Sequence, residues 1–143
     1  MYDFSRFYKA QEHDYERALK EIKNGKKESH WMWYIFPQIE GLGSSQMARY
    51  YSISDLKEAA AYFEDPVLGK RLTEISEALL SLSSDNVGEV MGWPDDLKLC
   101  SCMTLFRAAA PECEVFRKVL DKFYGGNPDG KTLEILKQKG SIR

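Results

Sequence analysis

The feature that most constrains the fold of this chain is the helical spacing of its apolar residues between clear helix boundaries. Behind Asp65 and the proline that follows it, apolar side chains recur three or four positions apart, at Leu68, Leu72, Ile75 and Leu79. That spacing gathers them on one face of an α-helix. An aspartate followed by a proline is typical of a helix start, because the carboxylate caps free N–H groups and proline fits the first turn. We therefore predict an amphipathic helix that buries this stripe.

Similar patterns predict helices along most of the chain. The first can be one helix or two, and Gly25 closes it. The expected helices cover residues 4–24, 30–36, 46–51, 55–63, 66–80, 87–91, 96–109, 112–123 and 131–137. Serine and aspartate side chains stand where several of them begin, and we expect these to act as caps. The predicted caps are Ser29, Ser44 or Ser45, Ser54, Asp65 and Asp95.

Strand signals are weak by comparison. No apolar and polar residues alternate over five positions, and no Asn-Gly turn joins two such runs. Hydrophobic residues make up 43% and aromatic residues 13% of the 143 positions, which argues against disorder and suffices for a substantial core. We predict an all-α fold in which residues 1–143 form a single compact domain, with helices packed in an orthogonal manner and little or no β-structure.

Charge and cysteine content exclude several classes of function. The 20 basic and 22 acidic residues give a net charge of −2, and the densest basic stretch is only residues 23–27. Affinity for nucleic acid comes largely from neutralising phosphates, so we expect no nucleic-acid partner. The three cysteines form no Cys-x-x-Cys pair, and the chain has two histidines. We therefore expect reduced thiols, no metal site and no cofactor.

Hydropathy argues against a membrane protein. The longest apolar run, residues 31–36, is far too short to cross a bilayer. The first ten residues lack the apolar core of a signal peptide. We expect a cytoplasmic protein with no membrane partner, and the sequence leaves its oligomeric state open.

The stretch "SHWMWYIFPQIEGLGSS", residues 29–45, concentrates aromatic side chains. A segment that is apolar on all sides is normally buried, so we expect a central core helix here. The other interpretation is a pocket wall, in which the flat face of Trp31 or Trp33 stacks on a ligand. The two are compatible, because a core helix can expose one ring. His30 at the start of this helix is a candidate general acid or base, although a histidine without a partner is more often structural.

The turn behind the aromatic run carries Gln38, Gly43 and Ser45. The segment "GLGSS" lacks the Lys-Ser/Thr ending of a phosphate-binding P-loop, and no strand precedes it. Glycines and serines ahead of a helix start still make a site that suits an anion. We take these three residues as candidate ligand-binding residues, with ordinary turn chemistry as the alternative.

A second concentration of candidate residues is "PDDLKLCSCMTLF", residues 94–106. Asp96 is a candidate general base or ribose-binding group, and Lys98 is a candidate anion-binding group. Ser101 and Thr104 offer hydroxyls to a ligand, or else allow close helix packing. The sequence shows no His and Asp partners for a nucleophilic triad. Helix capping with a local ion pair between Lys98 and the preceding aspartates is the alternative for this helix start.

Five ordered motifs give the chain a family resemblance: "SHWMWYIFPQIEGLGSS", "YYSI", "DPVLGKRL", "PDDLKLCSCMTLF" and "FYGGNPDGKTLEIL". They resemble the bacterial domain-of-unknown-function family numbered eighteen-ten, over nearly the whole chain. The resemblance implies a compact, almost entirely helical cytosolic domain, and it implies no established activity and so no catalytic residues. Cys102 stands where the family usually has a serine, which puts a hydroxyl-dependent role for this position in doubt. The label calpastatin, often attached to such sequences, does not fit, because that inhibitor is disordered and this chain has the composition of a preformed core.

Three hypotheses about function follow from these residues. The first is the binding or processing of a small molecule or nucleotide-like ligand in a pocket built from residues 30–45 and 95–104. The second is a non-enzymatic helical interaction module or homodimer, and the third is a core without a ligand. Whether the protein is an enzyme stays open. Convergence of His30, Gln38, Asp96 and Lys98 on one cleft favours the first, whereas an indole of residues 31–33 lying flat on the surface favours the second.

Overall fold

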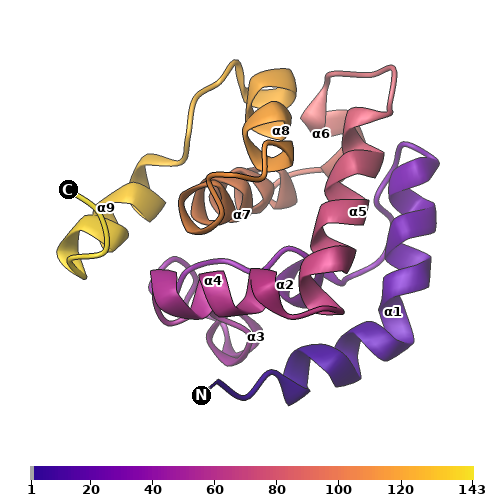
Figure 1. The fold of residues 1–143 in the computed structure, drawn as a ribbon. Helices are drawn as coiled ribbons and strands as arrows, with labels where there is room; N and C mark the ends of the chain where they lie inside the picture. Colours follow the sequence, from indigo (N-terminus) through magenta and orange to yellow (C-terminus); the bar gives the residue numbers. More distant parts are fainter. Residues whose placement is uncertain (1) are drawn as a thin grey trace.

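The computed structural model describes residues 2–143, and this part of the chain forms nine helices (Figure 1). They are α1 (Ser5–Lys23), α2 (Met32–Ile35), α3 (Gln46–Tyr50), α4 (Leu56–Glu64), α5 (Leu68–Leu80), α6 (Val87–Met91), α7 (Asp95–Ala109), α8 (Val115–Tyr124) and α9 (Gly130–Gln138). The prediction of an all-α fold is confirmed, since β-pairing in the described residues amounts to one isolated bridge between Ile39 and Ile53. None of the helices within residues 2–143 has the length and apolar character needed to span a membrane.

Helix α7 lies at the centre of the molecule (Figure 1). It packs against α4 and α8, and α6 and α9 contact it as well. Helix α5 packs against α1, α4 and α8, while α2 packs against α1. Segments from both halves of the chain therefore surround α7.

A column of four aromatic rings passes through the core. Ring centroids lie 5.1 Å apart for Phe7 and Tyr62, 5.4 Å for Tyr62 and Phe106, and 5.8 Å for Phe106 and Phe116. The four residues belong to α1, α4, α7 and α8, and all are fully buried. The Tyr62 hydroxyl accepts a hydrogen bond from Gln11 Nε2 at 2.9 Å, so its polar end has a partner inside the core. The column joins helices that are distant in sequence.

The aromatic run is part of this core, as predicted. Trp31 and Phe36 are fully buried, and the residues between them are buried except for Trp33. The helix in this run, α2, is only four residues long, because Pro37 follows closely. Trp33 is half-buried and presents part of its ring to the surface.

Several predicted helix boundaries are confirmed. Ser45 Oγ accepts a hydrogen bond from Ala48 N at 3.1 Å and so caps α3. Asp65 Oδ1 accepts from Val67 N at 3.0 Å and Leu68 N at 2.9 Å, which starts α5. The four apolar residues of the predicted α5 stripe are buried, and α1 is one continuous helix.

Two predicted caps are wrong, because other residues engage their polar groups. Ser29 does not cap α2, since its hydroxyl donates to Glu21 Oε2 at 2.6 Å. Asp95 does not cap α7, since its carboxylate pairs with Lys27 Nζ at 2.8 Å. In both cases the predicted capping side chain instead contacts a charged residue from another part of the chain: Glu21 on α1 or Lys27 just after it.

Several helix starts are displaced from their predicted positions, and α2 and α5 each begin two residues later than predicted, at Met32 and Leu68. The cap of α4 is Asp55, whose Oδ1 accepts from Glu58 N at 2.8 Å, rather than Ser54. Helix α8 begins at Val115 rather than at residue 112. The chain after α7 first makes a turn in which Cys113 N donates to Ala110 O at 3.0 Å, and this turn delays the helix.

Candidate functional site

A groove of about 490 Å³ lies where three chain segments meet beside the first turns of α7. The segments are the loop after α2, the beginning of α7 and the beginning of α9. Its lining residues are Gln38, Leu42, Gly43, Pro94, Leu97, Lys98, Ser101, Asp129, Gly130 and Lys131. The volume falls within the range of small-molecule sites. We refer to it as the Lys98 groove.

A recess of about 30 Å³ adjoins the Lys98 groove. The two share four lining residues: Gln38, Leu42, Gly43 and Lys98. A space of this size holds about one or two water molecules. A methyl group at position 43 would lie 2.6 Å from the Cβ of Ala48, so the loop approaches α3 as closely as a glycine allows. Gly43 therefore fixes the shape of the recess through its lack of a side chain.

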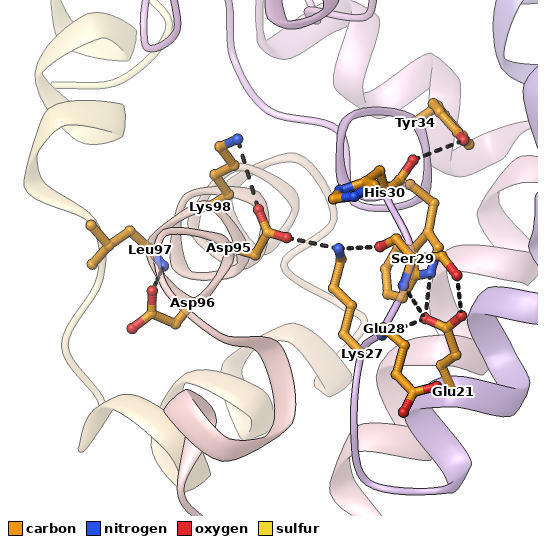
Figure 2. A network of polar contacts seen from close by, with 11 residues as sticks. Glu21, Lys27, Glu28, Ser29, His30, Tyr34, Asp95, Asp96, Leu97 and Lys98 are labelled. Atoms are coloured by element: carbon orange, nitrogen blue, oxygen red, sulfur yellow. Dashed lines mark hydrogen bonds and ion pairs between the residues drawn. The ribbon is translucent and has the colours of Figure 1, made fainter.

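Lys27, Asp95 and Lys98 form a group of three charges at the start of α7 (Figure 2). Asp95 Oδ2 lies 2.8 Å from Lys27 Nζ, and Asp95 Oδ1 lies 3.7 Å from Lys98 Nζ. The Lys27 side chain is 5% exposed, against 31% for Lys98. A buried ammonium depends on its partner far more than an exposed one does. Asp95 therefore compensates mainly the charge of Lys27, and the positive charge of Lys98 is compensated only weakly.

Lys98 is held in place by an aromatic ring as well as by Asp95. Its ammonium lies 5.3 Å from the ring centroid of Trp33, which is within the range of a cation–π contact. The ring face attracts the cation without supplying a negative charge. Because Lys98 lines both the groove and the recess, its charge is available to a ligand in either.

Glu21 fixes the segment before α2 (Figure 2). Its carboxylate accepts hydrogen bonds from the backbone N–H groups of Glu28 and Ser29, from Ser29 Oγ and from Trp31 Nε1, at 2.6–2.9 Å. Burial raises the pKa of this carboxyl, but the hydrogen bonds outweigh burial and lower the pKa to about 2. The indole N–H, the only polar group of the Trp31 side chain, therefore has its hydrogen-bond partner inside the protein. His30 lies on this anchored segment with its side chain exposed.

Ser101 and Thr104 connect α7 to the beginning of α9. Asp129 Oδ2 accepts from Ser101 Oγ at 3.1 Å, from Thr132 N at 3.0 Å and from Thr132 Oγ1 at 2.6 Å. Thr104 Oγ1 accepts from Asp129 N at 2.8 Å and donates to Cys100 O at 2.8 Å. These hydroxyl groups fix the third wall of the Lys98 groove in position.

The structure brings some of the predicted site residues together and leaves others apart. Gln38, Gly43, Lys98 and Ser101 line the groove, and Trp33 lines the recess. The predicted residues that line neither are His30, Trp31, Ser45, Asp96 and Thr104. Asp96 accepts a hydrogen bond from Leu97 N at 2.9 Å and points away from Asp95 (Figure 2). Of the four residues expected to converge, Gln38 and Lys98 do so, and the functional roles assigned to all of these residues stay predictions.

The thiols near the groove are weak nucleophiles. Burial, together with the nearby Asp129 charge, raises the pKa of the Cys100 thiol to about 11. Burial also raises the pKa of Cys102. Both thiols are therefore protonated near neutral pH. Among residues 2–143, no three His, Cys, Asp or Glu side chains gather closely enough to hold a metal ion.

Part of the site was not predicted from the sequence. Asp129 and Lys131 belong to the motif "NPDG" and the lysine after it, which we interpreted only as a turn and a helix start. An aspartate followed by Gly-Lys at a helix start was the available signal. Lys27 gave no local signal, because its partner Asp95 is far away in sequence. Trp93, which is 81% exposed beside Pro94, was also missed.

Comparisons with known proteins agree with the fold described above. The family model described as "Protein of unknown function (DUF1810)" matches residues 1–136. The chain is also similar to the crystal structure of the conserved hypothetical protein Rv1873 from Mycobacterium tuberculosis, with 44% sequence identity and a TM-score of 0.93. That alignment covers 94% of this chain and 96% of the Mycobacterium tuberculosis chain. No curated protein gives a significant match.

Proposed function

The chain belongs to the family described as "Protein of unknown function (DUF1810)", and we propose that it binds a small anionic ligand in the Lys98 groove. The ligand carries a phosphate or a carboxylate group. The observation that carries the proposal is the unequal sharing of Asp95, which lies 2.8 Å from the buried Lys27 ammonium and 3.7 Å from that of Lys98. One carboxylate cannot neutralise two ammonium groups, so positive charge is left at the groove.

The charged residues that line the groove also leave an excess of positive charge. Lys131 is a second lysine in the lining, and Asp129 is the acidic residue in it. The lining residues therefore carry two ammonium groups, those of Lys98 and Lys131, against one carboxylate. The whole chain has a net charge of −2, so this local excess runs against the average of the molecule. A concave site with excess positive charge attracts anions.

Hydrogen-bond donors accompany the charge. Gln38 Nε2 donates to Phe36 O at 3.3 Å, and a primary amide has a second N–H to offer. Gly130 and Lys131 occupy the first turn of α9, where backbone N–H groups have no partner within the helix. Together these groups can surround the oxygen atoms of a phosphate or carboxylate.

The alternative of an interaction module rested on the aromatic run. That run is buried, with Trp31 and Phe36 at 0% exposure, so it offers little surface to a partner. This supports the ligand-binding proposal over a partner that docks on residues 31–36.

The proposal is tested by removing the charge of Lys98. We expect Lys98→Gln to weaken the binding of inorganic phosphate or citrate about tenfold, because a charge-assisted hydrogen bond is worth about 1.5–3 kcal/mol. Isothermal titration calorimetry on the wild-type and variant proteins measures this directly. The affinity of the wild-type protein should also fall as the salt concentration rises.

Lys20→Gln is the matched control, since it removes the same charge from an exposed position on α1. It should leave the affinity unchanged. The proposal fails if neither anion binds the wild-type protein at millimolar concentration, or if the two variants lose the same affinity. Lys98 is partly exposed, so its replacement should leave the fold intact, which circular dichroism verifies.

A further inference from the structure

An exposed tryptophan, Trp93, directly precedes a residue that lines the Lys98 groove but does not itself line it. Trp93 is 81% exposed, and Leu97 one helical turn later is 57% exposed. Trp93 directly precedes Pro94, and both Pro94 and Leu97 line the groove. Large apolar side chains usually lie inside a protein, and an indole left in water is an informative exception.

The other two indoles of the chain are already engaged. Trp31 is fully buried and donates its N–H to Glu21 at 2.9 Å. The half-buried Trp33 ring has the Lys98 ammonium over its face. Trp93 is the indole whose faces remain open to solvent, so its ring can rotate without breaking packing contacts.

We infer that the anionic ligand carries a planar aromatic ring, which stacks on Trp93 while its anionic group binds at Lys98 and Lys131. This inference rests on the proposed function and adds the ligand class: an aromatic anion of the nucleoside monophosphate type. Pro94, which directly follows Trp93 in the chain, and Leu97 add apolar surface to the lining that carries Lys98 and Lys131. A nucleoside monophosphate combines a ring that can stack on an indole with a phosphate that an ammonium group attracts. Stacking on an aromatic side chain is tolerant of the identity of the base.

The test compares two ligands that carry the same phosphate. AMP and ribose 5-phosphate differ by the base, so the ratio of their dissociation constants isolates the contribution of the ring. We expect AMP to bind the wild-type protein about tenfold more tightly than ribose 5-phosphate, within the range of base–aromatic stacking. Trp93→Ala should abolish this difference and leave the affinity for ribose 5-phosphate unchanged. Trp93→Phe, which keeps a ring, should retain most of the preference.

The control variant is Tyr2→Ala, which removes another partly exposed aromatic side chain (39% exposed) from the N-terminal end of the chain. It should keep the preference for AMP. Quenching of the indole fluorescence by AMP provides a second readout. It should be stronger in the wild-type protein than in Trp93→Ala, where Trp33 beside Lys98 can still respond.

The outcomes separate this inference from the proposed function. Equal binding of AMP and ribose 5-phosphate, or a preference that survives Trp93→Ala, overturns the inference while leaving anion binding intact. Failure of both ligands, of inorganic phosphate and of citrate to bind overturns the proposed function and the inference with it. Trp93 makes few packing contacts, so its variants should fold, and an unchanged melting temperature confirms this.

Discussion

At Glu21, one carboxylate holds the whole segment that leads into α2, through hydrogen bonds from two backbone N–H groups, one hydroxyl and one indole. Glutamine in its place keeps one oxygen acceptor, but it loses the negative charge and puts an NH2 donor where the second oxygen accepted from the Ser29 hydroxyl. Buried donors without partners are costly. Single residues of this kind position the groove although they do not line it.

We expect Glu21→Gln to lower the free energy of unfolding at neutral pH by about 3 kcal/mol. The folded-state pKa of Glu21 is lowered from 4.5 to about 2, so its stabilisation is fully present above pH 4.5. That stabilisation is lost as the pH falls through the window between these two values. Urea denaturation of the wild-type and variant proteins between pH 7 and pH 3 should show that the variant lacks this loss.

The exposed Glu16 on the same helix provides the control. Glu16→Gln should follow the wild-type pH profile. Parallel profiles for wild-type and Glu21→Gln would contradict the role assigned to the Glu21 carboxylate.

The C-terminal end of α5 receives hydrogen bonds from a residue of another helix, α8. Lys122 of α8 donates to the carbonyl groups of Leu79 at 3.2 Å and Leu80 at 3.0 Å, and also to that of Leu82. The last carbonyl groups of a helix have no partner within it and carry partial negative charge. An ammonium group from a neighbouring helix therefore serves as the C-terminal cap of α5.

Lys122→Met keeps the apolar stem and removes the ammonium group. We expect it to lower the free energy of unfolding by about 1–2 kcal/mol, because the carbonyl groups lose both hydrogen bonds and a compensating charge. Thermal denaturation should show a decrease of several degrees. Lys118→Met, at an exposed position of the same helix, should change the melting temperature little, and equal effects of the two variants would argue against the cap.

Local sequence predicts helix boundaries only where the capping group has no competing partner. Ser45 and Asp65 act on their own helices, and both were predicted correctly. Ser29 and Asp95 carry the same type of signal but pair with Glu21 and Lys27. In those two cases the side chain pairs with a charge from another segment, because leaving a buried charge without a partner costs more free energy than leaving a helix end without a cap.

Over the whole molecule, the Lys98 groove depends on contacts between distant segments. Its first two walls come from the two segments that the sequence singled out, since Gln38, Gly43, Lys98 and Ser101 lie in them. The third wall, residues 129–131, was not predicted, because the packing of α9 against α7 has no local signature. Periodicity thus sufficed for the fold and for part of the site, while the remainder depends on long-range packing.

Lys27 tests this long-range dependence, since it lies between α1 and α2 and does not line the groove. Lys27→Met should leave Asp95 to Lys98 alone and so lower the excess positive charge. We expect a several-fold loss of phosphate affinity and a decrease of about 2 kcal/mol in the free energy of unfolding, below the usual cost of breaking a buried ion pair because Asp95 keeps one partner.

Calorimetry with inorganic phosphate checks the first effect, and urea denaturation checks the second. Lys26→Met, at the exposed neighbouring position, is the control and should change neither quantity. An unchanged or higher phosphate affinity in Lys27→Met would contradict the unequal sharing of Asp95.

The column of aromatic rings through α1, α4, α7 and α8 has a consequence for how the chain assembles. Helical proteins usually fold quickly because their contacts join residues close in sequence. Here the ring of Phe7 packs on that of Tyr62, in a helix far along the chain, and the ring of Phe106 packs on that of Phe116 in α8. Closing the chain segments between these rings costs conformational entropy before the packing energy of the core is gained. We therefore expect this chain to fold more slowly than a helical bundle of the same length whose contacts are all between neighbouring helices.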